Sequence, residues 1–283
     1  MNEYITVILL SHKSKDLVLN FIEKIYEKFS IIIIDNSNDK ELENIIKKKN
    51  KKITFKIIEN NGYGAAINYA SSLVKTKYFL ICNPDIEDLD ENKINEFEKA
   101  AKLLDDKFSV LGPRYTNLDP KSIKQSDEGK EISKMKFISG ACMFFKKKLF
   151  DELGGFDENF FLYFEESDFC LKASKVSQSY QINNIQIKHN IGSSVKVKNE
   201  KEKENLNKLY KWHFIWSKYY YYKKNYGLLL SILYFVPIYI RIRLRILFYT
   251  INKNNKKREN YLIRLDGLMT SVKGNKSHKR IDD

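Results

Sequence analysis

The first 115 residues alternate between short apolar runs and longer amphipathic segments. The apolar runs are nearly uninterrupted and rich in β-branched residues, which is typical of strands buried on both faces of a sheet. These strands are predicted at residues 5–10, 31–34, 53–58, 78–82 and 109–112. The segments between them space their apolar residues as helices do, and helices are predicted at residues 15–29, 39–49, 64–73 and 92–104. This alternation predicts an α/β fold in which helices cover both faces of a parallel sheet.

The regular alternation stops after Tyr115. Residues 116–135 are polar and are predicted as a loop. Beyond them we expect strands at residues 136–145 and 185–189, with helices at residues 147–153 and 166–175. The second half of the domain is therefore expected to be less regular than the first.

The charge is unevenly distributed along the chain. Residues 1–195 contain 29 Lys+Arg and 29 Asp+Glu, whereas residues 196–283 contain 21 and 7, so the last part carries the whole net charge of +14. A basic extension favours a polyanionic surface as partner, although a solvated Lys-rich face is the simpler alternative. Because no nucleic-acid-binding signature is present, we expect an anionic membrane surface and no nucleic acid.

The extension combines aromatic, apolar and basic segments. The apolar run at residues 227–240 has 14 residues, which is too short to span a bilayer, and it continues into alternating Arg and apolar residues. Residues 196–251 are predicted as a helical membrane-interface segment, with arginines on lipid phosphates and aromatic rings at the headgroup level. A buried helix packed on the preceding domain is the alternative. Residues 252–283 are polar and basic and are predicted to be partly disordered.

The cysteines and the N-terminal run point to a cytoplasmic protein. Cys82, Cys142 and Cys170 are far apart and form no CxxC pair, so the sequence indicates neither a disulfide framework nor a structural zinc site. The first apolar run has only six residues, too short for a signal peptide, and fits a first strand.

Polar residues follow four of the predicted strands. In open parallel sheets ligands bind at the carboxyl ends of strands, which directs attention to Ser11, Asp35, Asn60 and residues 83–85. Asp35 can accept a hydrogen bond from a pyrimidine or a ribose hydroxyl, or it can cap the next helix.

Two glycines lie between the third predicted strand and the helix after it. Gly62 and Gly64 can let a phosphate approach a helix N-terminus, or they can belong to an ordinary turn.

Two further residues could hold a divalent cation. Asp85, in the segment NPD, could bind Mg²⁺ or Mn²⁺ together with phosphate oxygens, or the segment could be a simple turn. His189 ends a predicted strand and becomes a second ligand only if it converges with Asp85. A lone histidine is otherwise structural.

The segment FFLYFEESDFC places Glu165, Glu166 and Asp168 against a run of aromatic residues. Three carboxylates beside so much apolar surface are unlikely to serve solubility alone. One explanation is that all three stabilise a helix N-terminus through its dipole.

The order of these segments between Ile5 and Ser194 resembles the inverting glycosyltransferases of family 2, which have the GT-A fold. The resemblance rests on VILLSHK, IIIIDNSND, NNGYGAAIN, CNPDI, the block from Ser139 to Ala173, and KHNIGSS, and it is greatest to the rhamnosyltransferase-like branch. It implies a catalytic domain at residues 1–195, with a Rossmann-like, mixed but mostly parallel sheet flanked by helices. A C-terminal helical, membrane-associating extension follows.

The resemblance also implies a role for each candidate residue. Ser11 and Asp35 hold the nucleotide base and ribose, and Asn60, Gly62 and Gly64 line the donor pocket. The family's DxD motif falls at residues 83–85, where Asn83 replaces the first Asp and bonds a ribose hydroxyl. The other implied roles are Asp85 and His189 as ligands of Mg²⁺ or Mn²⁺, Glu166 as the general base, and Gly140, Ala141, Asp157, Glu165 and Asp168 as acceptor or site-shaping residues.

The implied function is transfer of a sugar, L-rhamnose or another hexose, from a dTDP- or UDP-sugar to a glycan or polyprenyl-linked acceptor. Such an enzyme builds bacterial surface polysaccharide as a peripheral protein on the inner face of the cell membrane. The competing hypothesis is a non-catalytic basic membrane-docking protein on a glycosyltransferase-like scaffold.

Overall fold

The structure, a computed structural model, describes residues 3–25, 27–49, 53–120, 125–126, 129–197 and 199–280. The chain divides into two compact units. The first contains Met1–Phe156 and Phe169–Lys196, and the second contains Asp157–Asp168 and Val197–Asp283. The expected boundary at residue 195 lies beside the division at Lys196. The sequence did not indicate that residues 157–168 belong with the C-terminal helices.

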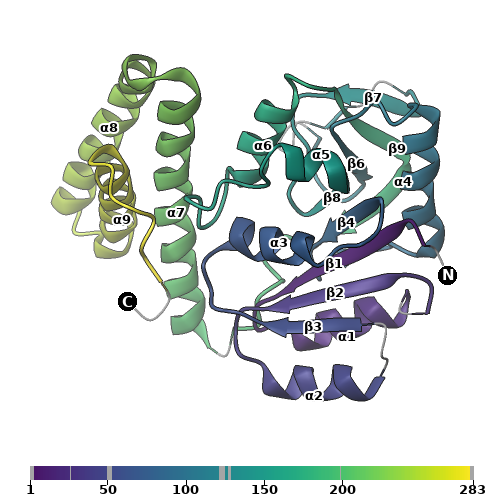
Figure 1. Cartoon of the computed structure of the whole chain (residues 1–283). Helices are drawn as coiled ribbons and strands as arrows, with labels where there is room; N and C mark the ends of the chain where they lie inside the picture. Colours follow the sequence, from purple (N-terminus) through teal and green to yellow (C-terminus); the bar gives the residue numbers. More distant parts are fainter. Residues whose placement is uncertain are drawn as a thin grey trace. The chain divides into compact units, whose positions relative to one another are not determined.

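The first unit is built on a mixed sheet with the strand order β3-β2-β1-β4-β8-β6-β9-β5, and β7 also pairs with β9 (Figure 1). The β3-β2-β1-β4 half is parallel throughout, and antiparallel pairs enter at β8. The central, mostly parallel sheet of the prediction is thus confirmed. The strands are β1 (Ile5–Ser11), β2 (Ser30–Asp35), β3 (Ile53–Ile57), β4 (Tyr78–Cys82), β5 (Ile86–Glu87), β6 (Val110–Tyr115), β7 (Ile132–Met135), β8 (Cys142–Lys146) and β9 (Ser179–His189).

Helices cover both faces of this sheet. They are α1 (Lys15–Glu23), α2 (Lys40–Lys49), α3 (Tyr63–Ser72), α4 (Glu91–Leu103), α5 (Lys147–Glu152) and α6 (Glu165–Ala173), the last of which begins in the second unit. Alternate residues of β1 enter two separate cores: Val7 and Leu9 pack with α1, α2 and α4, and Ile8 packs with α3, α5 and the C-terminal part of α6. Strands buried on both faces explain why their sequences are almost continuously apolar.

Several boundaries differ from the prediction. Of residues 136–145 only the part from Cys142 on is a strand, β9 starts at Ser179 rather than at residue 185, and α1 ends at Glu23. The short strands β5 and β7 were not predicted, and β7 lies in the stretch expected as a loop, of which residues 121–124 and 127–128 lie outside the described part. Both strands are short and part-polar, so neither has the apolar run that marks a buried strand.

The second unit contains three long helices, α7 (Glu200–Tyr226), α8 (Leu228–Ile251) and α9 (Asn255–Val272). Gly227 joins α7 to α8 with φ 85°, a left-handed conformation that glycine adopts at little cost. Side chains of all three helices share a core: Ile215, Tyr219, Phe235, Ile242 and Leu268.

The C-terminal segment is more ordered than predicted. Residues 252–283 were expected to be partly disordered, yet they contain α9, which Asn254 caps by accepting from the Lys257 amide at 3.1 Å. Leu268 is buried against the other helices, and that burial stabilises a segment whose composition is polar. Residues 281–283 lie outside the described part. In the part of the chain that is described, none of the helices is both long and apolar enough to cross a membrane.

Candidate functional site

In the first unit, the predicted donor residues follow the carboxyl ends of parallel strands. Ser11 and Asp35 end β1 and β2 and are direct neighbours in the strand register. Asn60 follows β3, and Asn83 and Asp85 follow β4. Because the four strands are parallel and adjacent, these residues come to one edge of the sheet, as the sequence predicted.

The Asp35 carboxylate is fully buried and organises the loop after β2. It accepts hydrogen bonds from the Ser37 amide at 3.0 Å, the Ser37 hydroxyl at 2.9 Å and the Asp39 amide at 2.9 Å. The helix that follows is capped by Asp39, which accepts from the Leu42 amide at 2.8 Å. Asp35 is therefore not the cap of α2. Its role in the structure is to hold the loop at the edge of the sheet.

A side-chain bridge joins the loops after β2 and β3. The Asn60 Oδ1 atom accepts from Asn36 Nδ2 at 3.1 Å and from the Gly62 amide at 3.3 Å. Gly62 precedes α3 with φ 104°, which favours glycine at this position. Gly64 is buried in the first turn of α3. Ser11 completes this edge, with its Oγ 3.2 Å from Ser14 Oγ.

Asp85 and His189 meet, although 103 positions separate them in the sequence. The two-residue strand β5 pairs with β9 and places Ile86 opposite His189, which brings the preceding Asp85 beside the imidazole. The Asp85 Oδ1 atom lies 3.4 Å from His189 Nε2, and Oδ2 accepts from Ser194 Oγ at 2.8 Å. The His189 amide donates to Asn117 Oδ1 at 3.0 Å, and Asn117 Nδ2 donates to the His189 carbonyl at 3.1 Å.

This pair has the character of an incomplete cation site. Asp85 is 2% exposed, and its Oδ1 atom is buried without a hydrogen-bond partner, a costly state that a bound cation would relieve. A carboxylate oxygen and an imidazole nitrogen suit Mg²⁺ or Mn²⁺. Among the described residues no group of three or more ligating side chains occurs, so the remaining ligands would have to come from a substrate. The residues present thus fit a cation shared between protein and phosphate.

Gly140 and Ala141 support the same edge through their backbone. The Tyr63 hydroxyl donates to the Gly140 carbonyl at 2.8 Å, and the Asn83 amide donates to the Ala141 carbonyl at 2.8 Å. The loop before β8 thereby contacts both the first residue of α3 and the NPD segment.

In the second unit, the three carboxylates of α6 are in different environments. Glu165 is buried with its Oε2 atom unpaired, and burial, followed by the charge of Glu166, raises its pKa well above the ordinary value. Glu166 is half-buried and accepts from the Ser167 hydroxyl at 3.0 Å; burial raises its pKa too, although backbone hydrogen bonds and the one from Ser167 oppose the rise. Of the two, Glu166 alone combines raised proton affinity with access to solvent.

The turn before α6 is held in an unfavourable conformation. Tyr163 and Phe164 both have left-handed backbones, with φ 69° and 71°. Such residues cost free energy and persist only where surrounding contacts fix them. Here the Phe164 ring packs on Phe214 and Tyr221 of α7, with centroids 5.6 and 5.4 Å apart. The conformation of this turn sets the direction in which α6 begins.

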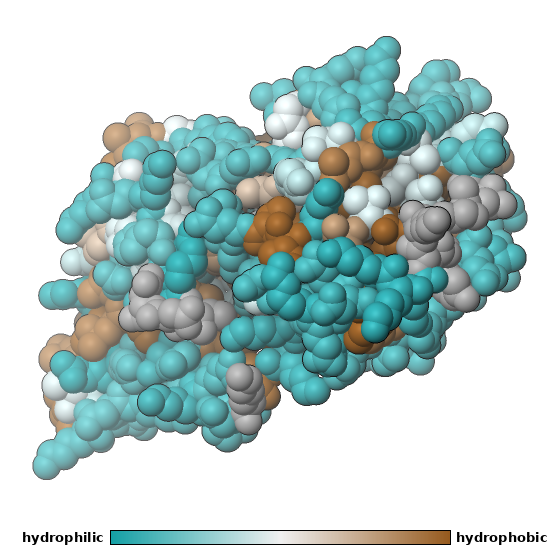
Figure 2. Space-filling view, turned by 60° about the horizontal axis from the view of Figure 1, so that its bottom comes forward, coloured by the Kyte–Doolittle hydropathy of each residue, from teal (hydrophilic) through white to brown (hydrophobic). Residues whose placement is uncertain are grey.

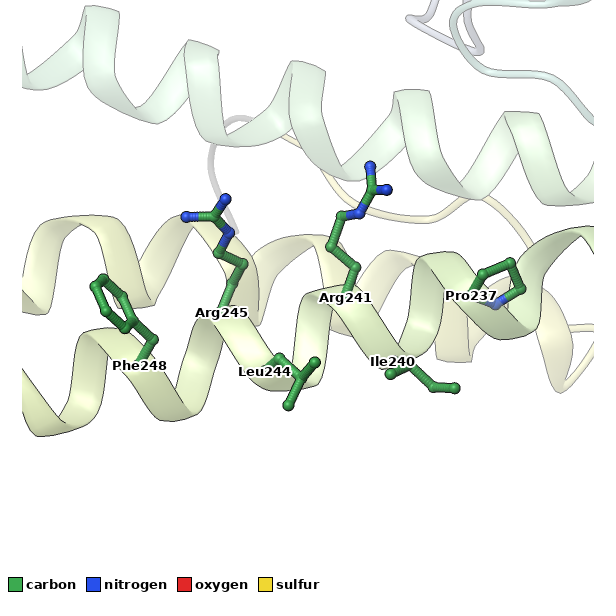
Figure 3. A pocket seen from close by; sticks show the side chains of 6 residues that line it. All are labelled: Pro237, Ile240, Arg241, Leu244, Arg245 and Phe248. Carbon is green, nitrogen blue, oxygen red and sulfur yellow. The ribbon is translucent and has the colours of Figure 1, made fainter.

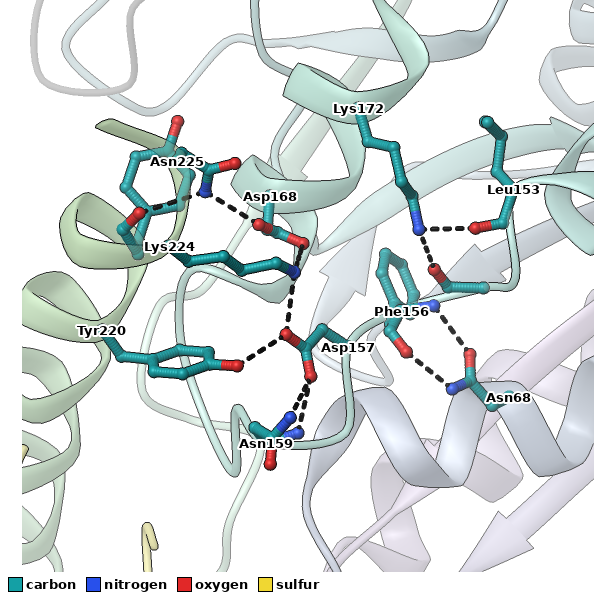
Figure 4. A network of polar contacts seen from close by, with 12 residues as sticks. Asn68, Leu153, Phe156, Asp157, Asn159, Asp168, Lys172, Tyr220, Lys224 and Asn225 are labelled. Carbon is teal, nitrogen blue, oxygen red and sulfur yellow. Dashed lines mark hydrogen bonds and ion pairs between the residues drawn. The ribbon is translucent and has the colours of Figure 1, made fainter. Parts of the chain in front are cut away.

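Asp168 and Asp157 belong to a polar network with α7 (Figure 4). Lys224 Nζ lies 2.7 Å from Asp168 Oδ2 and 2.8 Å from Asp157 Oδ2. Asn225 donates to Asp168 Oδ1 at 2.9 Å, and the Tyr220 hydroxyl donates to Asp157 Oδ2 at 3.0 Å. Both oxygens of Asp168 are occupied, so this carboxylate anchors the first turn of α6 to α7.

Sequence reasoning missed the partners that hold these groups. Ser194 and Asn117, which contact Asp85 and His189, and Lys224, which pairs with Asp168, were not singled out. Each is a common polar residue far in sequence from the group that it contacts. Ser194 alone gave a signal, since it ends the segment KHNIGSS.

With this geometry in view, comparisons with known proteins are informative. The family model described as Glycosyl transferase family 2 matches residues 6–155. The low-salt glycan biosynthesis hexosyltransferase Agl10 of Haloferax volcanii is 23% identical over 200 residues, which cover 62% of this chain and 63% of Agl10. An uncharacterized glycosyltransferase of Rickettsia typhi is 27% identical over 206 residues, which cover 68% of this chain and 62% of that protein. The chain therefore spans somewhat under two thirds of the length of these curated relatives.

Solved glycosyltransferase structures share the fold. S. aureus TarS superimposes with a TM-score of 0.50 at 13% identity, covering 74% of this chain and 39% of TarS. GalNAc-T7, solved with UDP, GalNAc and Mn²⁺, superimposes with a TM-score of 0.54 at 15% identity, covering 77% of this chain and 49% of GalNAc-T7. These likenesses agree with the GT-A architecture. Because the family model covers more than half of the sequence, the chain belongs to glycosyl transferase family 2, a family of glycosyltransferase enzymes.

Proposed function

We propose that the chain is an inverting hexosyltransferase that moves a sugar from a nucleoside-diphosphate sugar to a glycan acceptor. The observation that carries this proposal is the pair formed by Asp85 and His189 at the carboxyl edge of the sheet. Its unsatisfied carboxylate oxygen supports a divalent cation, Mg²⁺ or Mn²⁺, shared with the donor diphosphate. When bound, such a cation neutralises the charge that develops on the leaving nucleoside diphosphate.

The remaining donor contacts come from the same edge of the sheet. Ser11 and Asp35 bind the base and ribose, Asn83 bonds a ribose hydroxyl, and the segment with Asn60, Gly62 and Gly64 lines the pocket for the diphosphate. The loops that carry these residues are bridged by hydrogen bonds, so they are fixed before the donor binds. Such preorganisation lowers the entropic cost of binding.

Glu166 is the general base in this proposal. Its carboxylate takes the proton of the acceptor hydroxyl as the new bond forms from that oxygen to the anomeric carbon. The bond from the anomeric carbon to the donor phosphate breaks, and the electron pair leaves with the nucleoside diphosphate. The raised pKa of Glu166 suits this task, whereas Asp168 is engaged by Lys224 and Asn225. Glu165, Asp157 and Asp168, with Gly140 and Ala141, shape the site or support its elements.

The finer assignments belong to the same proposal. The donor is a dTDP- or UDP-sugar carrying L-rhamnose or another hexose, as in the rhamnosyltransferase-like branch. The acceptor is a lipid-linked glycan, and the product enters a bacterial surface polysaccharide; the part played by Agl10 in glycan biosynthesis is in keeping with this. We place residues 1–195 as the catalytic domain and residues 196–251 as the segment that holds it on the anionic inner face of the cell membrane.

Donor turnover tests the proposal. Release of nucleoside diphosphate is measured from dTDP-, UDP- and GDP-sugars with Mn²⁺ or Mg²⁺ and a lipid extract as acceptor source, and nucleotide binding is followed by calorimetry. We expect release from one donor class, loss of release in Asp85→Asn and in Glu166→Gln, and retained donor binding in Glu166→Gln. The exposed carboxylate variant Glu152→Gln is the control.

One observation favours a second candidate, a non-catalytic membrane-docking protein: all of the net charge lies in residues 196–283. Absence of both release and nucleotide binding across the donor panel would support that function. Release that persists in Glu166→Gln would instead remove Glu166 from the role of base while leaving the transferase intact.

A further inference from the structure

Helix α8 exposes a continuous stripe of large aliphatic side chains. The stripe recurs every three or four positions, so its members lie on one face of the helix. Their exposed fractions range from 46% to 71%. The stripe consists of Leu229, Leu233, Val236, Ile240, Leu244, Leu247 and Ile251. It runs for about 33 Å along the helix at 1.5 Å per residue.

The opposite face of α8 is the one that packs within the second unit. Ser231, Phe235 and Ile242 are buried there, and Phe235 and Ile242 join the core shared with α7 and α9. Hydrophobic residues also reach the surface on the side of the C-terminal helices in Figure 2. A helix that is already covered on one face does not need its other face for folding. The stripe is therefore available to a partner of this chain.

Arginines flank the stripe on both sides. Arg243 lies beside the stripe on one side, and on the other side Arg241 and then Arg245 lie progressively farther from it, as their spacing around the helix requires. Helix α8 contains no acidic residue, and none of the three arginines forms an ion pair with another residue in the described part of the chain. The arginines lie beside the exposed aliphatic stripe. A partner that suits both features has an apolar interior bordered by anionic groups.

One edge of the stripe is hollowed into an open pocket of about 510 Å³ (Figure 3). Arg241 and Arg245, one turn apart, extend their guanidinium groups to the same side, away from Ile240 and Leu244. Pro237 and Phe248 complete the lining. The pocket thus combines two adjacent guanidinium groups, which suit phosphate, with apolar lining residues.

We infer that α8 docks in the plane of an anionic membrane, with the aliphatic stripe in the acyl boundary and Arg241 and Arg245 on the phosphate of an anionic lipid headgroup. This inference gives the proposed membrane setting a surface and an orientation, and it rests on that part of the proposed function and not on the transfer chemistry. Amphipathic helices of this kind sink about 5–10 Å into the boundary between headgroups and acyl chains. A second copy of the chain is a poorer occupant, because pairing two stripes would set arginine rows against each other.

Vesicle binding by the full chain, measured without donor, tests the inference. Extruded vesicles of phosphatidylcholine alone, or of phosphatidylcholine with phosphatidylglycerol, are sedimented with the protein. We expect binding to the anionic vesicles that weakens as salt rises. The double variant Arg241→Gln/Arg245→Gln should lower the partition coefficient about 30-fold, since each arginine near an anionic surface contributes a factor of about 5.

The matched control removes the same charge elsewhere in the unit. Lys273 and Lys276 are exposed, and the variant Lys273→Gln/Lys276→Gln should lower binding much less. Leu233→Glu/Leu244→Glu should abolish binding to the anionic vesicles. Because both residues are exposed, the fold should survive, which thermal melting by circular dichroism verifies.

Three outcomes would overturn the inference: no binding of the wild-type chain to anionic vesicles, equal losses in the arginine and lysine pairs, or a wild-type dimer in light scattering that the leucine variant converts to monomer. The last outcome assigns the stripe to self-association. None of them changes nucleotide binding measured by calorimetry, which needs no lipid, so failure of docking and failure of the transferase proposal are distinguishable.

Discussion

Loss of the Lys224 ammonium is the perturbation with the clearest expected magnitude. Asp168 is 2% exposed and depends on Lys224 and Asn225 for its hydrogen bonds. Lys224→Met keeps the aliphatic stem but leaves the carboxylate with one partner. Removing one member of a buried pair costs about 3–5 kcal/mol, and because the Lys224 side chain is 35% exposed we expect the lower end, about 3 kcal/mol. In a unit of this size that lowers the melting temperature by roughly 10–20 °C.

The same variant tests whether the network positions the first turn of α6. Asp168 lies two residues after Glu166 in that turn, so loosening it should lower kcat with little change in the KM for the donor. Lys224→Arg keeps the charge and should recover most of the activity. The neighbouring Lys223→Met is the control. Its side chain is half-buried and lies next to Lys224 on α7.

A double variant makes the reasoning refutable. Lys224→Met leaves both Asp168 and Asp157 without their cation, and Asp168 is the more buried of the two. Asp168→Asn/Lys224→Met also removes the Asp168 charge, so it should be more stable than Lys224→Met. Thermal melts of the wild type, Lys224→Met and the double variant decide the matter. If Lys224→Met melts close to the wild-type temperature, or if the double variant is less stable than the single one, the network does not carry the free energy that we assign to it.

Three further predictions concern other parts of the chain. Burial lowers the pKa of His213 to about 4, so the unfolded chain takes up a proton first as the pH falls, and the unfolding free energy should be about 2 kcal/mol lower at pH 5 than at pH 7. Urea titrations should show this slope to be absent in His213→Gln, and equal slopes in both proteins would contradict it. Gly267→Ala places a Cβ 2.7 Å from the Trp212 carbonyl oxygen, so α7 and α9 must separate at a cost of about 1–3 kcal/mol. Urea unfolding measures this loss of stability beside the exposed control variant Lys273→Ala. Equal stability of the two variants would contradict the close packing of α7 and α9. Ser194→Ala removes the hydrogen bond to Asp85 and should weaken Mn²⁺ binding in the presence of UDP about 10–100-fold. Spin-resonance titration measures this affinity, and the control Ser193→Ala should leave it unchanged. Unchanged Mn²⁺ affinity in Ser194→Ala would argue against the cation site.

The sequence by itself determined the architecture of the first unit. Short, β-branched apolar runs such as IIII in β2 are typical of strands covered on both faces, so the parallel half of the sheet and its helices were predictable from the sequence. The candidate residues at strand ends followed from that prediction, because the carboxyl ends of neighbouring parallel strands share one edge. Short elements such as β5 were not predicted, since two residues are too few to show an alternation of apolar and polar positions.

Only the tertiary structure decided which polar groups are paired. The two-residue strand β5 brings Asp85 to His189, and the long helix α7 brings Lys224 to Asp168, although neither pair is close in sequence. It also distinguished the environments of the α6 carboxylates, since burial and the Lys224 network differ among Glu165, Glu166 and Asp168, which look alike in the sequence.

Helix α8 shows the same division. Its apolar residues alternate with arginines in the sequence, and both a buried helix and an interfacial one fitted that pattern. The packing of Phe235 and Ile242 against α7 and α9 shows which face is buried, and thereby which aliphatic stripe remains exposed. Local patterns depend on neighbours along the chain and report the period of an element, whereas pairing and exposure depend on contacts between distant segments, which only the folded chain brings together.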